Sequence, residues 1–118
     1  MKIREIASLL AADVLCGEAL LDEEVQSACG SDMMSDVLAY VKDQGVLVTG
    51  LVNPQVIRTA MMMDMRCIVF VRNKRPTPEM LDLAKEHHMA VLASESRMYE
   101  ACGKLYSSGL GHGACANG

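Results

Sequence analysis

The chain has 118 residues, 51% of them hydrophobic, and a formal net charge of −4 at pH 7. This length suits a single domain with a modest core, and the acidic balance argues against a non-specific nucleic-acid-binding protein, which needs a basic face. No apolar stretch is long enough to cross a membrane. Arg4 and Glu5 interrupt the N-terminal segment, so we expect no signal peptide and a cytoplasmic location.

The N-terminal part of the chain predicts two helices and two short strands. A helix is expected over about Lys2–Ala11, followed by a short strand over Ala12–Leu15. Glu24–Cys29 alternates in polarity, which predicts an edge strand. Ser31-Asp32 is a favourable helix start. The apolar face of the helix that follows is expected to consist of Met34, Val37, Leu38 and Val41.

Three segments in the rest of the chain repeat one plan, namely a short β-branched run, a polar turn and an amphipathic helix. They begin at Val46, Cys67 and Ala90, about two dozen residues apart. Apolar runs with little polar interruption are typical of strands buried on both faces, as in a parallel sheet. Parallel strands need crossover helices, and the spacing supplies them. We therefore predict a single α/β domain with a central, mostly parallel sheet flanked by helices.

The helices of these three segments have clear boundaries. Asn53-Pro54 and Thr77-Pro78 each place an N-cap before a proline at the first helical position. The last helix is expected over about Ser96–Tyr106, with Cys102 on its apolar face. Residues 1–110 form the predicted domain, and the glycine-rich residues 111–118 a flexible tail. The buried stripe of the helix after Pro78 is expected to be Met80, Leu81, Leu83, Ala84 and His88.

Open α/β sheets bind ligands outside the carboxyl ends of their strands, so the turns there are the candidate site. In V-T-G-L-V-N-P, Thr49 and Gly50 follow a strand and Asn53 caps a helix. The N–H groups of a helix N-terminus attract anions, so a phosphate could dock there. The motif lacks the lysine and extra glycines of known phosphate loops. A turn between a strand and a helix, with Asn53 as an ordinary N-cap, explains this motif equally well.

The turn after the next strand, V-R-N-K-R-P, is basic. Successive parallel strands usually lie side by side, so Arg72 and Lys74 could bring positive charge to the same anion. Ser94 and Ser96, on the third turn, complete the candidate ligand site. A solvated basic turn is the alternative. We expect no cofactor, and a nucleotide or phosphorylated metabolite is the candidate ligand.

Catalytic and metal signals are weak. No nucleophile elbow and no known order of Ser, His and Asp is present, so we predict no enzyme. Asp32 could face the candidate site, although helix capping explains it equally. His112 and Cys115 have H-x-x-C spacing without two further ligands nearby, so no metal site is predicted. A metal or redox accessory role is the weakest alternative.

Four blocks of this sequence together resemble the DRTGG domain family over Lys2 to Leu110. The resemblance is to small stand-alone members of anaerobic bacteria, which often accompany iron-only hydrogenase and electron-transfer genes. It implies an α/β domain similar to the HPr kinase N-terminal domain, a homodimer, and a regulatory module that carries no chemistry. The blocks are G-S-D-M-M-S-D-V-L-A-Y, L-V-T-G-L-V-N-P-Q-V-I-R-T-A, C-I-V-F-V-R-N-K-R-P and A-V-L-A-S-E-S-R-M-Y-E-A-C-G-K-L-Y.

One departure from the family changes the expectation for the first turn. The Asp-Arg pair that names the family should follow Thr49-Gly50, where this chain has Leu51 and Val52. An apolar replacement fits a packed interface better than a polar pocket. Successive residues of a helix point about 100° apart, so Met61, Met62 and Met63 cannot all face the core. We therefore expect Leu51, Val52, Met61 and Met62 at a homodimer interface.

The predicted function is a non-catalytic regulatory or ligand-sensing module that acts as a homodimer. The resemblance adds a link to hydrogenase or electron-transfer metabolism and a protein partner in such a system. The alternative is a nucleotide- or phosphate-metabolite-binding enzyme subunit that uses Thr49, Gly50, Asn53 and Arg72.

Overall fold

The computed structural model describes residues 1–40 and 45–110. In chain order the elements are α1 (Ile3–Leu9), β1 (Asp13–Cys16), the short 3-10 helix η1 (Glu18–Leu20), β2 (Ala28–Gly30), α2 (Met34–Tyr40), β3 (Val46–Thr49), α3 (Pro54–Met62), β4 (Cys67–Phe70), α4 (Pro78–Glu86), β5 (Ala90–Ala93) and α5 (Met98–Ser107). The predicted tail, with His112 and Cys115, lies outside the described residues, and so does Val41 of the second predicted helix.

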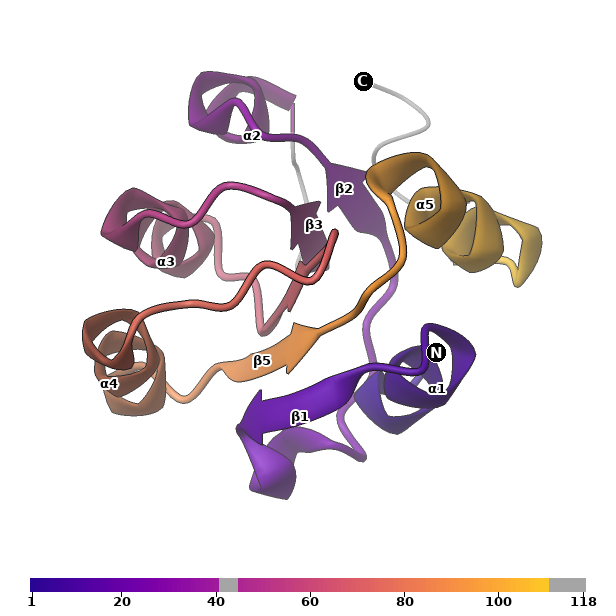
Figure 1. Cartoon of the computed structure of the whole chain (residues 1–118), viewed down its shortest axis with the longest axis horizontal. Coiled ribbons are helices and arrows are strands. Elements are labelled where there is room, and N and C mark those ends of the chain that lie inside the picture. The colour runs from indigo at the N-terminus through magenta and orange to yellow at the C-terminus, as the bar shows by residue number, and fades with distance from the viewer. Residues whose placement is uncertain (41–44, 111–118) are drawn as a thin grey trace.

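The strands form one sheet in the order β1-β5-β4-β3-β2. The pairs from β2 to β5 are parallel, and β1 is antiparallel to β5. Helices α2, α3 and α4 cover one face of this sheet, and α1 and α5 cover the other (Figure 1). The predicted α/β fold with a mostly parallel central sheet is confirmed. In the described part of the chain, no helix is long and apolar enough to span a membrane.

The pleat of each strand divides the buried side chains between two cores. Ile68 and Phe70 of β4 point into the core under α2, α3 and α4. Cys67 and Val69 point into the core under α1 and α5. Every residue of β3, β4 and β5 is buried. This burial confirms the strands that the apolar runs predicted.

The two predicted helix caps are present. The Asn53 side chain accepts a hydrogen bond from the Gln55 N–H at 2.8 Å, and Thr77 accepts one from the Met80 N–H at 3.2 Å. Each cap precedes a proline at the start of its helix. These caps explain why α3 and α4 start where the sequence predicted.

Two expected core positions are wrong. Leu38 is 41% exposed, because α2 lies at one side of the sheet (Figure 1) and only Met34 and Val37 of its expected stripe meet the core. His88 is exposed. Helix α4 ends at Glu86 and His88 adopts a left-handed conformation with φ 55°. That turn brings Met89, instead of His88, into the core.

Candidate functional site

The carboxylate of Asp32 is the centre of the polar contacts at the carboxyl edge of the sheet. Its Oδ1 accepts hydrogen bonds from Thr49 Oγ1 at 3.0 Å and from the Gly50 N–H at 2.7 Å. Its Oδ2 accepts a hydrogen bond from Arg72 Nη2 at 3.3 Å, so Arg72 and Asp32 also form an ion pair. Three segments therefore meet at one carboxylate: the β2–α2 loop, the end of β3 and the loop after β4.

Asp32 faces this site because Ser31 shapes the loop before α2. The Met33 N–H donates to Ser31 Oγ at 3.0 Å, and the Ser31 N–H donates to Val48 O at 3.0 Å. The second bond holds the loop beside β3 and directs Asp32 toward Thr49. The sequence allowed Asp32 either to cap a helix or to face the candidate site. In the structure, Asp32 faces the candidate site.

The loop after β4 has an unusual backbone. Arg72 and Asn73 have φ values of 59° and 57°, a left-handed conformation that is uncommon for residues other than glycine. The Arg72 N–H donates to Ser96 O at 2.8 Å, and the Asn73 N–H donates to Ser94 O at 3.0 Å. These bonds tie the loop after β4 to the loop after β5.

The Arg72 side chain then folds over Gly50. A Cβ added to Gly50 would collide with the Arg72 guanidinium. Glycine is therefore needed here for close approach of a side chain to the backbone. Arg72 and Asp32 are 48% and 46% exposed, so their ion pair is open to solvent.

The hydroxyl groups of the candidate site lie below this surface. Thr49 is fully buried, and besides donating to Asp32 it accepts from the Leu51 N–H at 3.2 Å. Ser94 is 2% exposed; its Oγ donates to Leu10 O at 2.8 Å and accepts from the Ser96 N–H at 3.1 Å. Both hydroxyls hold the loops in shape.

The structure thus brings Thr49, Gly50 and Arg72 together, with Ser94 and Ser96 on the loop bonded to the Arg72 backbone. Asn53 lies at the start of α3 and caps it. Lys74 is exposed on the same loop as Arg72. The neighbouring Arg75 turns away and pairs with Asp13 of β1 at 2.6 Å.

At this edge a carboxylate of the chain itself lies among three hydrogen-bond donors. A backbone N–H, a hydroxyl and a guanidinium all donate to Asp32. These are the donors that proteins use for phosphate and carboxylate groups. A solvent-exposed ion pair is worth about 0–1 kcal/mol, so little free energy holds the Asp32 carboxylate against Arg72.

The residues expected at a homodimer interface do not form one continuous patch. Leu51 is half-buried and packs against the core under α2–α4. Val52 is 36% exposed before the start of α3, whereas Met61 and Met62, 37% and 66% exposed, lie at its other end. The nine-residue helix α3, about 13 Å long, separates the two ends.

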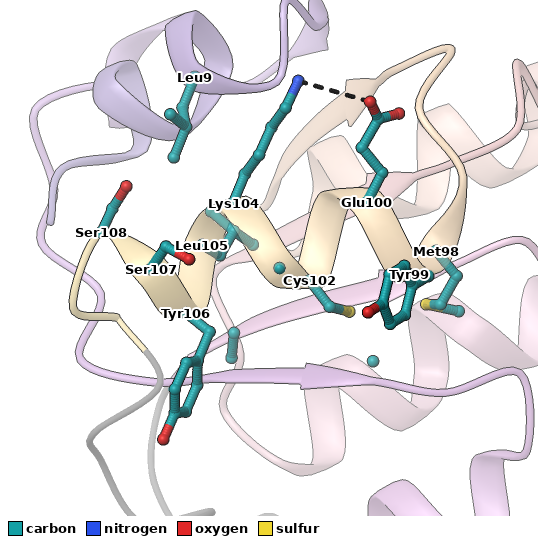
Figure 2. Close-up of a pocket in the computed structure, with 13 residues that line it drawn as sticks. Leu9, Met98, Tyr99, Glu100, Cys102, Lys104, Leu105, Tyr106, Ser107 and Ser108 are labelled. Carbon is teal, nitrogen blue, oxygen red and sulfur yellow. Dashed lines mark ion pairs between the residues drawn. The ribbon is translucent and has the colours of Figure 1, made fainter.

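A hollow elsewhere in the molecule was missed from the sequence. It is a cavity of about 1100 Å³ beside α5, which we call the α5 groove. Tyr99, Cys102 and Tyr106 have the spacing i, i+3, i+7 and point to the same side of α5, while Glu100 and Lys104 point to the other (Figure 2). This spacing can be read from the sequence and could have predicted that the three side chains share one side of α5. The groove is defined here by Ala28, Gly30, Tyr99, Cys102, Gly103 and Tyr106.

Within residues 1–40 and 45–110, no three His, Cys, Asp or Glu side chains lie close enough together to bind a metal ion.

Comparisons with known proteins give three findings. No curated protein matches the chain. The fold is similar to the crystal structure of the CBS and DRTGG domains of the regulatory region of Clostridium perfringens pyrophosphatase, complexed with the activator diadenosine tetraphosphate. The TM-score is 0.71 at 13% sequence identity, over 91% of this chain and 46% of that one. This likeness shows the fold alone. Among protein families, the DRTGG domain matches residues 5–108. The chain therefore belongs to the DRTGG domain family.

Proposed function

We propose that this chain is a non-catalytic regulatory module that senses an anionic metabolite at the carboxyl edge of its sheet and acts as a homodimer. Family membership and the likeness to a regulatory region that was solved with a nucleotide activator support this proposal. A cytoplasmic location, and a link to hydrogenase or electron-transfer metabolism through a protein partner, belong to the same proposal and rest on the sequence resemblance.

The observation that carries the proposal is the set of donors around Asp32. If Asp32 swings into solvent, the Gly50 N–H, the Thr49 hydroxyl and the Arg72 guanidinium become available to a phosphate group. Hydrogen bonds to charged groups contribute about 1.5–3 kcal/mol each, and Asp32 already makes such bonds to Gly50 and Thr49. An anionic ligand would therefore replace Asp32 through its higher charge beside Arg72 and not through a larger number of bonds to the same donors.

The test is isothermal titration with ATP, AMP and acetyl phosphate. The unmodified chain should bind at least one of them, and Arg72→Ala should weaken binding roughly tenfold or more, since 1.4 kcal/mol is one decade. Arg75→Ala is the matched control, because it removes the same charge from the same loop but faces Asp13. Asp32→Asn removes the competing negative charge and should tighten binding several-fold.

Each other result has a defined meaning. Equal affinity in the unmodified chain and in Arg72→Ala would exclude Arg72 from the site. If none of the three anions binds at millimolar concentration, the ligand-sensing role is wrong and a purely protein–protein role is favoured. Turnover of a bound ligand in the same samples would support the alternative, a nucleotide- or phosphate-metabolite-binding enzyme subunit.

A further inference from the structure

The outer edge of β2 presents backbone groups that have no partner among residues 1–40 and 45–110. On the inner side of β2, Ser27 O accepts from the Val46 N–H and the Ser31 N–H donates to Val48 O, each at 3.0 Å. Backbone groups of a strand alternate in direction, so Cys29 also faces β3. The N–H and C=O groups of Ala28 and Gly30 consequently point outward.

The two edges of the sheet differ in their protection against pairing with another chain. At β1, Asp13 forms an ion pair with Arg75, and the register shifts between Val14 and Cys16. Charges and irregular register are the usual means of blocking an edge strand. Residues 25–31 (V-Q-S-A-C-G-S) contain no charged residue and no proline. The β2 edge therefore lacks the features that prevent pairing.

The α5 groove adds an apolar surface beside this edge. Tyr99 is 92% exposed and Tyr106 is 59% exposed. Both belong to the side of α5 that faces away from Glu100 and Lys104 (Figure 2). Aromatic residues are enriched, and charged residues depleted, at the centres of protein interfaces. The edge and the groove thus form one surface with the composition of an interface.

Helix α5 runs antiparallel to β2. A Cβ added to Gly30 would meet Cys102 Sγ at 2.5 Å and Met98 Sδ at 3.2 Å. The N-terminal part of α5 therefore lies over Gly30, at the end of β2, and Tyr106 lies toward the start of the strand.

We propose that a second copy of this chain occupies the α5 groove, with the β2 strands of the two copies paired antiparallel about a two-fold axis. The inference rests on the proposed homodimer and places its contact surface. Because the backbone N–H and C=O groups of Ala28 and Gly30 point outward, Ala28 of one copy would lie opposite Gly30 of the other. Each such pair exchanges two main-chain hydrogen bonds. The result is one continuous sheet through both copies, related by the symmetry usual for homodimers.

The same two-fold axis makes the helices complementary. Since α5 is antiparallel to β2, Tyr99 of one copy would face Tyr106 of the second copy. Helix α5 packs over β2 and β3, so the two α5 axes would lie about two strand spacings, or about 10 Å, apart. That is the distance between packed helices, about 8–10 Å. A second copy therefore fits without rearrangement of the sheet.

The exposed tyrosines supply a large part of the area that a specific dimer needs. A fully exposed aromatic residue can bury about 150–250 Å², so with Tyr99 92% and Tyr106 59% exposed, the four tyrosines of two copies would bury about 450–750 Å². A standard interface buries about 1,600 Å² in total. Met98, Cys102 and the β2 backbone add to the contact. Self-complementarity of both the strand and the tyrosines favours a second copy over an unrelated peptide.

Sedimentation velocity of the full chain at micromolar concentration tests the inference. The unmodified chain should sediment as a dimer. Ala28→Pro removes an N–H that has no partner within the described chain, so the bonds to β3 remain while the intermolecular pairing is blocked. Tyr99→Glu places a charge in the contact without disturbing the monomer, since Tyr99 is 92% exposed. Both variants should sediment as monomers.

Met62→Glu, in the surface first expected from the sequence, is the control and should remain dimeric. Circular dichroism establishes whether each variant folds. If Ala28→Pro does not fold, the sedimentation of Tyr99→Glu alone tests the inference. A dimer that persists in Tyr99→Glu overturns the inference, and its loss in Met62→Glu would move the contact to α3. A monomeric unmodified chain overturns this inference and the homodimer, whereas the anion titration is unaffected and tests the ligand site separately.

Discussion

The guanidinium of Arg72 rests on the Cα of Gly50 so closely that no Cβ fits between them. Gly50→Ala should therefore push Arg72 away from Asp32. The group that must move is the end of a flexible side chain, and the exposed ion pair is worth about 0–1 kcal/mol. We expect the free energy of unfolding in urea to change by less than about 1 kcal/mol, while anion affinity falls as far as in Arg72→Ala.

Gly103→Ala is the control for this substitution. Gly103 lies within α5, and a Cβ there meets no atom within 4 Å. Alanine should stabilise the helix by about 0.5–1 kcal/mol relative to glycine. If Gly50→Ala instead lost several kcal/mol, Gly50 would be required by the backbone of the β3–α3 turn and not by Arg72.

Ser94→Ala should destabilise the fold. The buried Ser94 hydroxyl donates to Leu10 O and accepts from the Ser96 N–H, and its removal leaves these buried or half-buried groups without that partner. A loss of about 1–3 kcal/mol is expected in urea unfolding. Ser107→Ala, at an exposed position of α5, should change the free energy of unfolding by less than about 0.5 kcal/mol. Equal effects would show that the Ser94 bonds are not needed.

Thr59→Val should stabilise the fold. Thr59 is fully buried in α3, and its Oγ1 has no hydrogen-bond partner in the described part of the chain. Valine keeps the branched shape and removes a hydroxyl whose burial costs about 1–3 kcal/mol. A gain of about 1 kcal/mol in the free energy of unfolding is expected. A loss would mean that the hydroxyl finds a partner in solution, such as an ordered water.

The stability of the chain should fall above pH 9. Burial raises the pKa of the fully buried Cys67 thiol well above its ordinary value of 9.0. The unfolded chain therefore releases this proton before the folded chain does, so the contribution is complete below pH 9 and is lost as the pH rises. Burial also raises the pKa of the Cys16 and Cys102 thiols, which acts in the same direction.

Urea unfolding at several alkaline pH values measures this effect. Each thiol that ionises only in the unfolded chain contributes a slope of about 1.4 kcal/mol per pH unit. Cys67→Ala should make the slope shallower by one such contribution, whatever its effect on stability at neutral pH. Equal slopes in the two proteins would show that the Cys67 thiol ionises equally in the folded and unfolded chains.

The C-terminal half of the fold could be predicted because its local signals agree with one another. The apolar run at Val46–Thr49 is bounded by an N-cap and a proline at Asn53 and Pro54, and the same combination recurs at Thr77. Once these strands are parallel and adjacent, the proximity of Gly50 and Arg72 follows from strand order alone.

The role of Asp32 and the α5 groove depend on contacts between distant segments, which the local sequence pattern does not reveal. Asp32 follows a strand of only three residues, and an acidic residue before a helix is as compatible with a cap as with a site. The α5 groove shows the same limit. The spacing of Tyr99 and Tyr106 is visible in the sequence, but it marks an open surface only when α5 is known to pack over β2 at the edge of the sheet.

The bonds from the backbone of Arg72 and Asn73 to Ser96 and Ser94 also bear on motion. Ser96 lies just before α5, so the carboxyl edge is connected to the start of that helix by main chain alone. Loops joined in this way open as one cooperative unit. The amides of Arg72 and Asn73 should therefore exchange with deuterium at a common rate. An anion that orders the Arg72 loop would slow this exchange and, through the same bonds, stiffen the N-terminal turn of α5, where Tyr99 lies.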